Sequence, residues 1–181
     1  MKTRLWIVAT TLAASLYSAA ASAEMVIGVK GGAVDYDADW IGSTEPGLNG
    51  SLQLAFDIFD LGFADIAVEG EYSTTLTEAE IDLVNSIIPT LDASLDTTAL
   101  YLSLRTAGPV YVIARVGYAK SDLKLENDFG SISDDDTAAS TGIGVGFSMG
   151  VRMEIEYTQY KPEFDTFGDT DIKYLTLGFG F

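Results

Sequence analysis

Apolar and polar residues alternate with a period of two along most of this chain. In the stretch 171–181 one face is wholly apolar, and it consists of Leu175, Leu177, Phe179 and Phe181. Successive side chains of a β-strand point to opposite faces, so this period is typical of a strand with two different surroundings. The alternation predicts eight strands in all, at residues 25–36, 50–59, 63–73, 97–106, 110–121, 140–149, 151–160 and 171–181.

Tight turns and long polar connections alternate between these strands. The turns are 60–62, 107–109 and 150, and the long connections are 37–49, 74–96, 122–139 and 161–170. In the second long connection, Thr77-Glu78-Ala79-Glu80 matches a capping box ahead of apolar residues at roughly helical spacing. We therefore predict an all-β fold: an eight-stranded antiparallel up-and-down barrel with a short helix near residues 78–88.

Residues 1–23 have the three parts of a secretory signal peptide. Lys2 and Arg4 supply the positive start, residues 5–20 are largely apolar or small, and Ala21-Ser22-Ala23 is an A-x-A cleavage site. No other stretch approaches the ~18 consecutive apolar residues of a membrane-spanning helix. We expect cleavage after residue 23, export from the cytoplasm, and a single β-barrel domain at 24–181.

A soluble eight-stranded barrel has the same period of two, but its apolar faces point inward, whereas those of a membrane barrel point outward. The direction of the apolar faces therefore decides between the two. Strand 140–149 has glycine and serine on its polar face, as a narrow lumen requires, and the middle of each apolar face carries no charge. Aromatic residues gather at the two ends of the strands: Tyr72, Tyr118 and Tyr157 at one end, and Phe56, Phe147, Phe179 and Phe181 at the other. Two such girdles are typical of a transmembrane barrel.

The polar faces then form the interior, which holds charges of both signs. Asp57 lies on such a face, and we expect an Arg–carboxylate network made by Lys30, Asp65, Glu69, Glu71, Arg105, Arg115, Arg152, Glu154 and Glu156. A single charge removed from water costs roughly several kcal/mol, so these groups must pair or keep water. An eight-stranded barrel is wide enough only for its own side chains. The lumen is thus predicted to be a polar core rather than an open pore.

The composition excludes several kinds of chemistry. The chain has 27 acidic and 10 basic residues and a net charge of −17, which argues against a nucleic-acid partner. It has neither cysteine nor histidine, so it lacks thiolate metal ligands and the commonest general base. No paired-acid or serine motif is recognisable at the strand tips. We expect no catalytic site, no metal site and no cofactor.

The closing strand, which ends on Phe181, resembles the C-terminal signature of Gram-negative outer-membrane β-barrels. The glycine-rich strands 25–36 and 140–149, the segment 152–157 and the signal peptide extend this resemblance to the small eight-stranded barrels, which include the OmpA transmembrane domain and OmpX. The resemblance implies a Gram-negative outer-membrane location and contact with membrane lipid and lipopolysaccharide. It also implies that the barrel-assembly machinery recognises Leu175, Leu177, Phe179 and Phe181. Barrel enzymes of this membrane that rely on a histidine are not matched, because this chain has none.

The resemblance specifies an architecture and leaves two functions open. One is a structural or surface-interaction barrel that displays acidic loops, and the other is a narrow porin-like channel for water, ions or small solutes. More than half of the 27 acidic residues lie in the four long connections. A further hypothesis is that these carboxylates hold divalent cations, which bridge them to anionic lipopolysaccharide.

Overall fold

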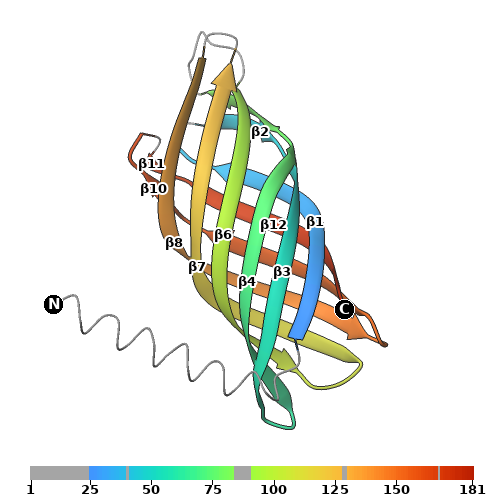
Figure 1. Cartoon of the computed structure of the whole chain (residues 1–181). Helices are drawn as coiled ribbons and strands as arrows, with labels where there is room; N and C mark the ends of the chain where they lie inside the picture. The colour runs from blue at the N-terminus through green and yellow to red at the C-terminus, as the bar shows by residue number, and fades with distance from the viewer. Residues whose placement is uncertain (1–24, 40, 84–90, 128–129, 167) are drawn as a thin grey trace, which may run out of the picture.

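Antiparallel strands make up most of the chain described by the computed structural model, which covers residues 25–39, 41–83, 91–127, 130–166 and 168–181 (Figure 1). Within these ranges no helix is long and apolar enough to cross a membrane. The strands are β1 (Met25–Asp37), β2 (Ile41–Glu45), β3 (Gly47–Asp60), β4 (Ala64–Thr77), β5 (Ala79–Leu83), β6 (Leu91–Thr106), β7 (Val110–Asn127), β8 (Gly130–Ser148), β9 (Arg152–Tyr160), β10 (Glu163–Phe164), β11 (Gly168–Asp169) and β12 (Asp171–Gly180).

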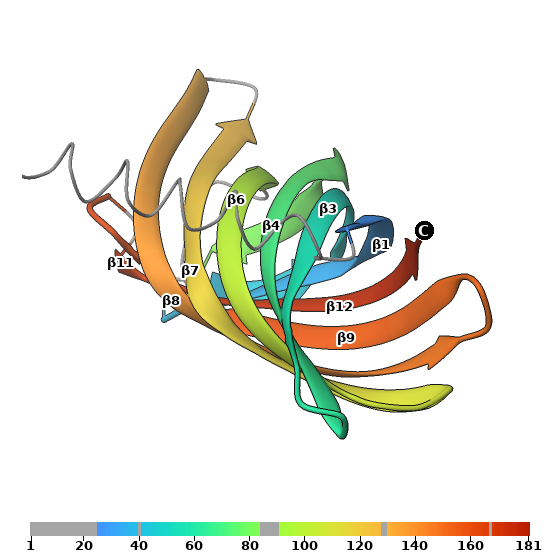
Figure 2. The ribbon, with the colours of Figure 1, turned by 60° about the horizontal axis from the view of Figure 1, so that its bottom comes forward.

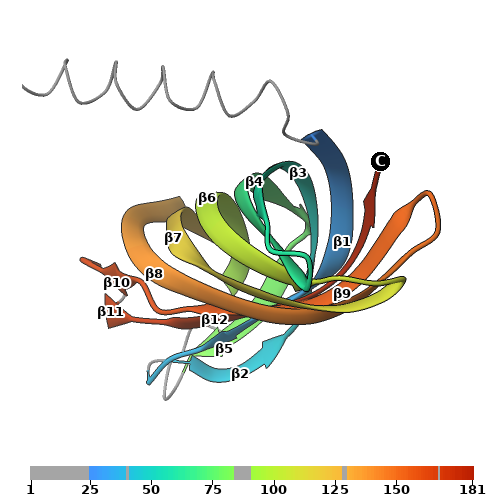
Figure 3. The same ribbon diagram turned by 90° about the horizontal axis from the view of Figure 1, so that it is seen from below.

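Eight of these strands close into a barrel. Each pairs with antiparallel neighbours in the order β1, β3, β4, β6, β7, β8, β9 and β12, and β12 returns to pair with β1. Seen from below, β1, β3, β4, β6, β7 and β8 arch over β9 and β12 (Figure 3). Barrel strands that are neighbours in space are also neighbours along the chain, which is the up-and-down order. The predicted eight-stranded antiparallel barrel is confirmed.

The three predicted tight turns lie at one end of the barrel, which we call the turn end (Figure 1). Each contains a glycine with a left-handed backbone: Gly62 has a φ of 79°, Gly108 of 124° and Gly150 of 86°. Residues that carry a Cβ rarely adopt such angles. Glycine at these three positions therefore allows the chain to reverse within a few residues.

The sheet of the barrel continues past the barrel at the opposite end, which we call the loop end. The strands β6, β7 and β8 extend beyond the barrel, β5 pairs with β6, and β2 pairs with β5. The loop-end sheet comprises β2, β5 and residues 91–96, 122–127 and 130–139. The β10–β11 hairpin lies beside β8, where the backbone N–H groups of Glu163 and Thr166 donate to the carboxylates of Asp136 and Asp134 (Figure 2).

Two expectations about the loop end are wrong. The helix expected near residues 78–88 is absent from Ala79–Leu83, which form strand β5, and residues 84–90 lie outside the described part of the chain. Residues 122–127 and 130–139, expected as parts of a connection, continue β7 and β8. Pairing with β6 buries Ala79 and Ile81 completely, and this tertiary contact overrides the local helical spacing. The expected signal peptide also lies outside the described residues.

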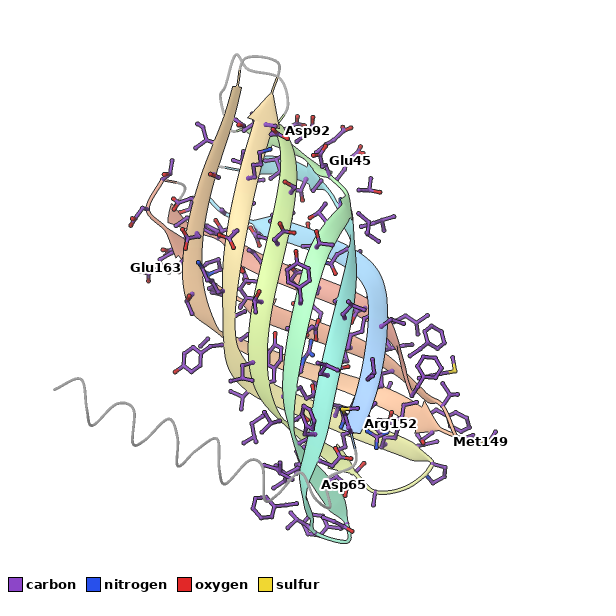
Figure 4. All side chains as sticks on the ribbon, in the orientation of Figure 1. Glu45, Asp65, Asp92, Met149, Arg152 and Glu163 are labelled. Atoms are coloured by element: carbon purple, nitrogen blue, oxygen red, sulfur yellow. The ribbon has the colours of Figure 1, made fainter. Side chains whose placement is uncertain are left out.

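The apolar faces of the barrel strands point outward. Leu52, Leu100 and Ile143 are 60–62% exposed, whereas the charged side chains of Lys30 and Glu69 are almost completely buried. Met149 points away from the barrel at the turn end (Figure 4). An apolar exterior around a polar interior is the arrangement of a membrane barrel, because the outer side chains meet lipid.

Candidate functional site in the barrel lumen

A trough of glycines along β8 makes room for the side chains of the lumen. Gly142, Gly144 and Gly146 occupy alternate, inward-facing positions. A Cβ on Gly146 would lie 2.3 Å from the ring of Tyr111, and a Cβ on Gly144 would lie 2.6 Å from the carbonyl oxygen of Ile155. The polar face of this strand therefore serves a crowded lumen, as its glycines predicted.

Lys30 and Arg115 share two carboxylates in the middle of the lumen. The ammonium group of Lys30 contacts Glu71 at 3.1 Å and also contacts Glu156. Arg115 contacts the same carboxylates, at 2.7 Å for Glu71 and 3.5 Å for Glu156. The guanidinium of Arg115 lies 4.3 Å from the centre of the Tyr101 ring, within range of a cation–π interaction. These contacts connect β1, β4, β6, β7 and β9 through the interior.

Arg105 forms a second group of ion pairs around Glu69. It contacts Glu69, and its Nε lies 3.4 Å from a carboxylate oxygen of Glu154. Glu69 is fully buried, and it also accepts hydrogen bonds from Gln53 Nε2 at 2.8 Å and from the hydroxyl of Ser103 at 2.6 Å. Several donors on one carboxylate offset the cost of removing it from water.

Asp57, and not Asp65, completes this network at the turn end. Asp57 lies 3.5 Å from Arg105 and 3.3 Å from Arg152. Asp65 faces Arg105 in the β4–β6 register, but among the described residues no cation lies within 4.0 Å of its carboxylate. Asp65 and Arg152 both lie near the turn end (Figure 4). We call the connected set the charged layer: Lys30, Asp57, Glu69, Glu71, Arg105, Arg115, Arg152, Glu154 and Glu156.

Hydroxyl groups occupy the next part of the lumen, toward the loop end. The OH of Tyr160 lies 3.0 Å from the hydroxyl of Thr97, and the rings of Tyr160 and Tyr174 stack with their centroids 5.9 Å apart. The hydroxyl of Thr158 accepts a hydrogen bond from Arg115 at 2.6 Å, which joins this part to the charged layer. We call it the hydroxyl layer. Its members are the hydroxyl side chains of Ser51, Ser73, Thr97, Ser121, Ser140, Thr158, Tyr160, Tyr174 and Thr176, together with the amide side chain of Asn49.

An apolar layer closes the lumen at the loop end. The inward side chains of the loop-end sheet pack there against β1, β10 and β12, and the layer consists of Val34, Tyr36, Ile81, Leu95, Leu123, Leu125, Phe164 and Ile172. Each of these side chains is at most 5% exposed. Side chains therefore fill the described lumen in three successive layers, which are charged, hydroxyl-bearing and apolar.

The apolar layer was missed by the sequence reasoning, although a signal for it was present. Leu91, Ala93 and Leu95 alternate with polar residues, and so do Leu123 and Leu125. Both runs lie in segments predicted to be long connections, where acidic residues fill the alternate positions. A period of two was the better guide in these segments.

The outer face of the loop-end sheet carries two rows of carboxylates at directly paired positions. One row is Glu45, Glu80, Asp92 and Glu126, and the other is Asp96, Asp122 and Asp135. Glu45 and Asp92 lie at the loop end (Figure 4). Lys120 lies 3.0 Å from Asp135. In the described part of the chain no three acidic side chains are arranged to hold a metal ion.

The residues of the last strand complete the apolar exterior. Leu175, Leu177, Phe179 and Phe181 are all exposed on the outer face, next to β1. A family model of the outer membrane protein beta-barrel domain matches residues 6–181. The chain belongs to this family. Its members are located in the outer membrane of Gram-negative bacteria, where lipid covers the apolar exterior.

Solved structures of small outer-membrane barrels have the same fold. Neisserial surface protein A matches with a TM-score of 0.66 and 10% identity, covering 88% of this chain and 97% of its own. OprG from Pseudomonas aeruginosa matches with a TM-score of 0.58, 10% identity and the same coverage. The outer membrane enzyme PagL matches with a TM-score of 0.50 and 12% identity, covering 84% and 97%. Comparison with curated protein sequences gave no match.

Proposed function

We propose that this protein is a closed structural barrel of the outer membrane, and that its loop-end sheet faces the outside of the cell and takes part in surface interactions. The succession of charged, hydroxyl and apolar layers carries this proposal, because side chains fill the lumen along its described length. The orientation follows the family, in which the short turns are periplasmic and the longer loops are extracellular.

Conductance tests the proposal directly. Protein reconstituted in a planar bilayer is expected to give no large, stable current steps, because the apolar layer excludes hydrated ions from the lumen. An open porin reconstituted in the same way serves as the positive control. Sustained steps of porin size would show that the layers move aside and would overturn the proposal.

A narrow channel for water, ions or small solutes is the second candidate. Its support is the polar character of the charged and hydroxyl layers, in which Arg115 and Thr158 are hydrogen-bonded. Such a channel would require the apolar layer to open, and brief, small current steps would indicate it.

We propose no enzymatic activity: PagL is an enzyme with this fold, but this chain has no histidine and its buried carboxylates are held in ion pairs.

We propose in addition that divalent cations stabilise the loop-end sheet and connect it to lipopolysaccharide. Like charges directly opposite each other on neighbouring strands are destabilising, and the carboxylate rows place Asp92 opposite both Glu80 and Glu126. Mg²⁺ is therefore expected to raise the melting temperature of the purified barrel above its value in a chelator. Sodium chloride at equal ionic strength is the control for screening, and identical melting temperatures would refute the proposal.

We also propose that Leu175, Leu177, Phe179 and Phe181 form the signal that the barrel-assembly machinery recognises. This proposal is supported by the exposed apolar row that the four side chains form on the last strand of the barrel. Side chains that contact neither the lumen nor the core are free to contact another protein before the barrel reaches lipid.

A further inference from the structure

The lumen contains polar atoms that have no hydrogen-bond partner among the described residues. They include the hydroxyl oxygens of Ser51 and Thr176, the amide nitrogen of Asn49 and the Nε of Arg115. Each of these residues is at most 6% exposed. Buried polar atoms in proteins are nearly always bonded to protein or to ordered water, so these atoms indicate a missing partner.

The neighbours of Thr176 on the two adjacent strands explain why no side chain supplies that partner. On β9 the residue paired with Thr176 is Glu156, whose carboxylate contacts Lys30 and Arg115 instead. On β1 the residue paired with Thr176 is Gly32, which is also paired with Asn49 on β3. A Cβ on Gly32 would lie 2.0 Å from the carbonyl oxygen of Leu175, so only glycine fits there. The strand between Asn49 and Thr176 therefore contributes no polar side chain.

A cavity of about 10 Å³ is lined by two of these residues. Arg115 and Thr176 line it, together with Glu71 from the charged layer and Tyr160 and Tyr174 from the hydroxyl layer. A cavity of this size holds one water molecule when two to four polar groups surround it. This cavity is lined by both donors and acceptors.

We propose that the cavity binds one internal water molecule, which accepts a hydrogen bond from Arg115 Nε and bonds to the hydroxyl of Thr176. The water joins the charged layer to the hydroxyl layer and supplies the partner that Gly32 cannot. Because the apolar layer lies between the cavity and the loop end, this water exchanges slowly with the solvent. Thr176 positions it.

The test is a set of crystal structures at a resolution that shows ordered water. The wild type is expected to show a peak within hydrogen-bond distance of Arg115 Nε and Thr176 Oγ1. Thr176→Val keeps the shape of the side chain and removes the hydroxyl, so the peak is expected to disappear. Thr176→Ser keeps the hydroxyl and is expected to keep the peak. Thr141→Val, at an exposed, outward position of β8, is the matched control and leaves the peak unchanged.

A wild-type map without this peak would overturn the proposal, and so would an equal peak in Thr176→Val. Where Thr176→Val does not fold, the wild type and Thr176→Ser decide by a second measurement. Magnetisation transfer from a long-lived water to the amide protons of residues 175–177 is then expected by NMR in both proteins. Its absence from both would also overturn the proposal.

Discussion

At the scale of single residues, the size of a side chain matters as much as its charge. Glu69 and Arg105 are buried, but their partners offset the cost of burial. Gly144 contributes only by being small, because it faces the backbone of β9 and the side chain of Glu156. The charged layer therefore depends on the glycine trough as much as on its own ion pairs.

Gly144→Ala is expected to destabilise the barrel by about 1–3 kcal/mol, the usual cost of adding atoms to a packed interior. Its Cβ would lie 2.6 Å from the carbonyl oxygen of Ile155, which the β8–β9 ladder holds in place. Urea unfolding of the refolded protein in lipid vesicles measures the change in free energy. Gly70→Ala is the matched control, because nothing lies within 4 Å of a Cβ on Gly70. Equal effects at both positions would contradict the role assigned to the trough.

The nine residues expected in the network show what a sequence can specify at this scale. A period of two assigns the face of each residue. In the structure, eight of the nine contact an opposite charge. It does not assign the height at which side chains from different strands meet, because that depends on the shear of the barrel. For this reason Asp57 could not be distinguished from Asp65 as the partner of Arg105.

At the scale of elements, the barrel strands could be predicted but strand β5 of the loop-end sheet could not. Strands that cross the membrane alternate over a long stretch and end in aromatic residues, so their number and order were clear. The β5 strand has only five residues, and its capping-box sequence favoured a helix. Its conformation depends on pairing with β6, a contact that becomes apparent only when both strands are placed in the fold.

Leu123→Ala is expected to loosen the loop-end sheet and leave the barrel intact. Leu123 is fully buried in the apolar layer, where such a truncation costs about 2–5 kcal/mol. Hydrogen exchange is expected to rise in β2, β5 and the outer parts of β6 to β8, and to stay slow in β9 and β12. Leu102→Ala, on the outer face of β6, is the control and is expected to leave exchange at the loop end unchanged. Equal loss of protection in all strands would show that the loop end and the barrel unfold as one unit.

At the scale of the whole molecule, the apolar exterior and the polar interior exchange the roles that they have in a soluble protein. The exterior is stable only in lipid, so the chain must reach the membrane before its outer face is covered. The last strand is placed between β9 and β1, and it therefore closes the barrel.

Phe181→Ser tests the proposed assembly signal. The fraction of protein that forms a heat-modifiable band in SDS gels of cell envelopes is expected to fall. Purified Phe181→Ser refolded in detergent is expected to form that band as the wild type does, because this side chain does not pack in the lumen. Phe63→Ser is the matched control, since both side chains are 71% exposed. A similar loss in cells for both variants would indicate a general effect of lost apolar surface.

The position of the apolar layer has a consequence for a cell that is exposed to proteases. Half of the layer, Ile81, Leu95, Leu123 and Leu125, comes from the loop-end sheet. In the proposed orientation this sheet stands outside the bilayer, whereas the ion pairs lie in the barrel. Digestion of the loop-end sheet would remove part of the apolar layer. The barrel left in the membrane would then have a cavity that is open to the medium and lined by tyrosine hydroxyls. The floor of this cavity would be the ion pairs that Arg115 and Lys30 make with Glu71 and Glu156, so a digested cell would present a hydroxyl-lined cavity over paired charges where the intact protein presents an acidic surface.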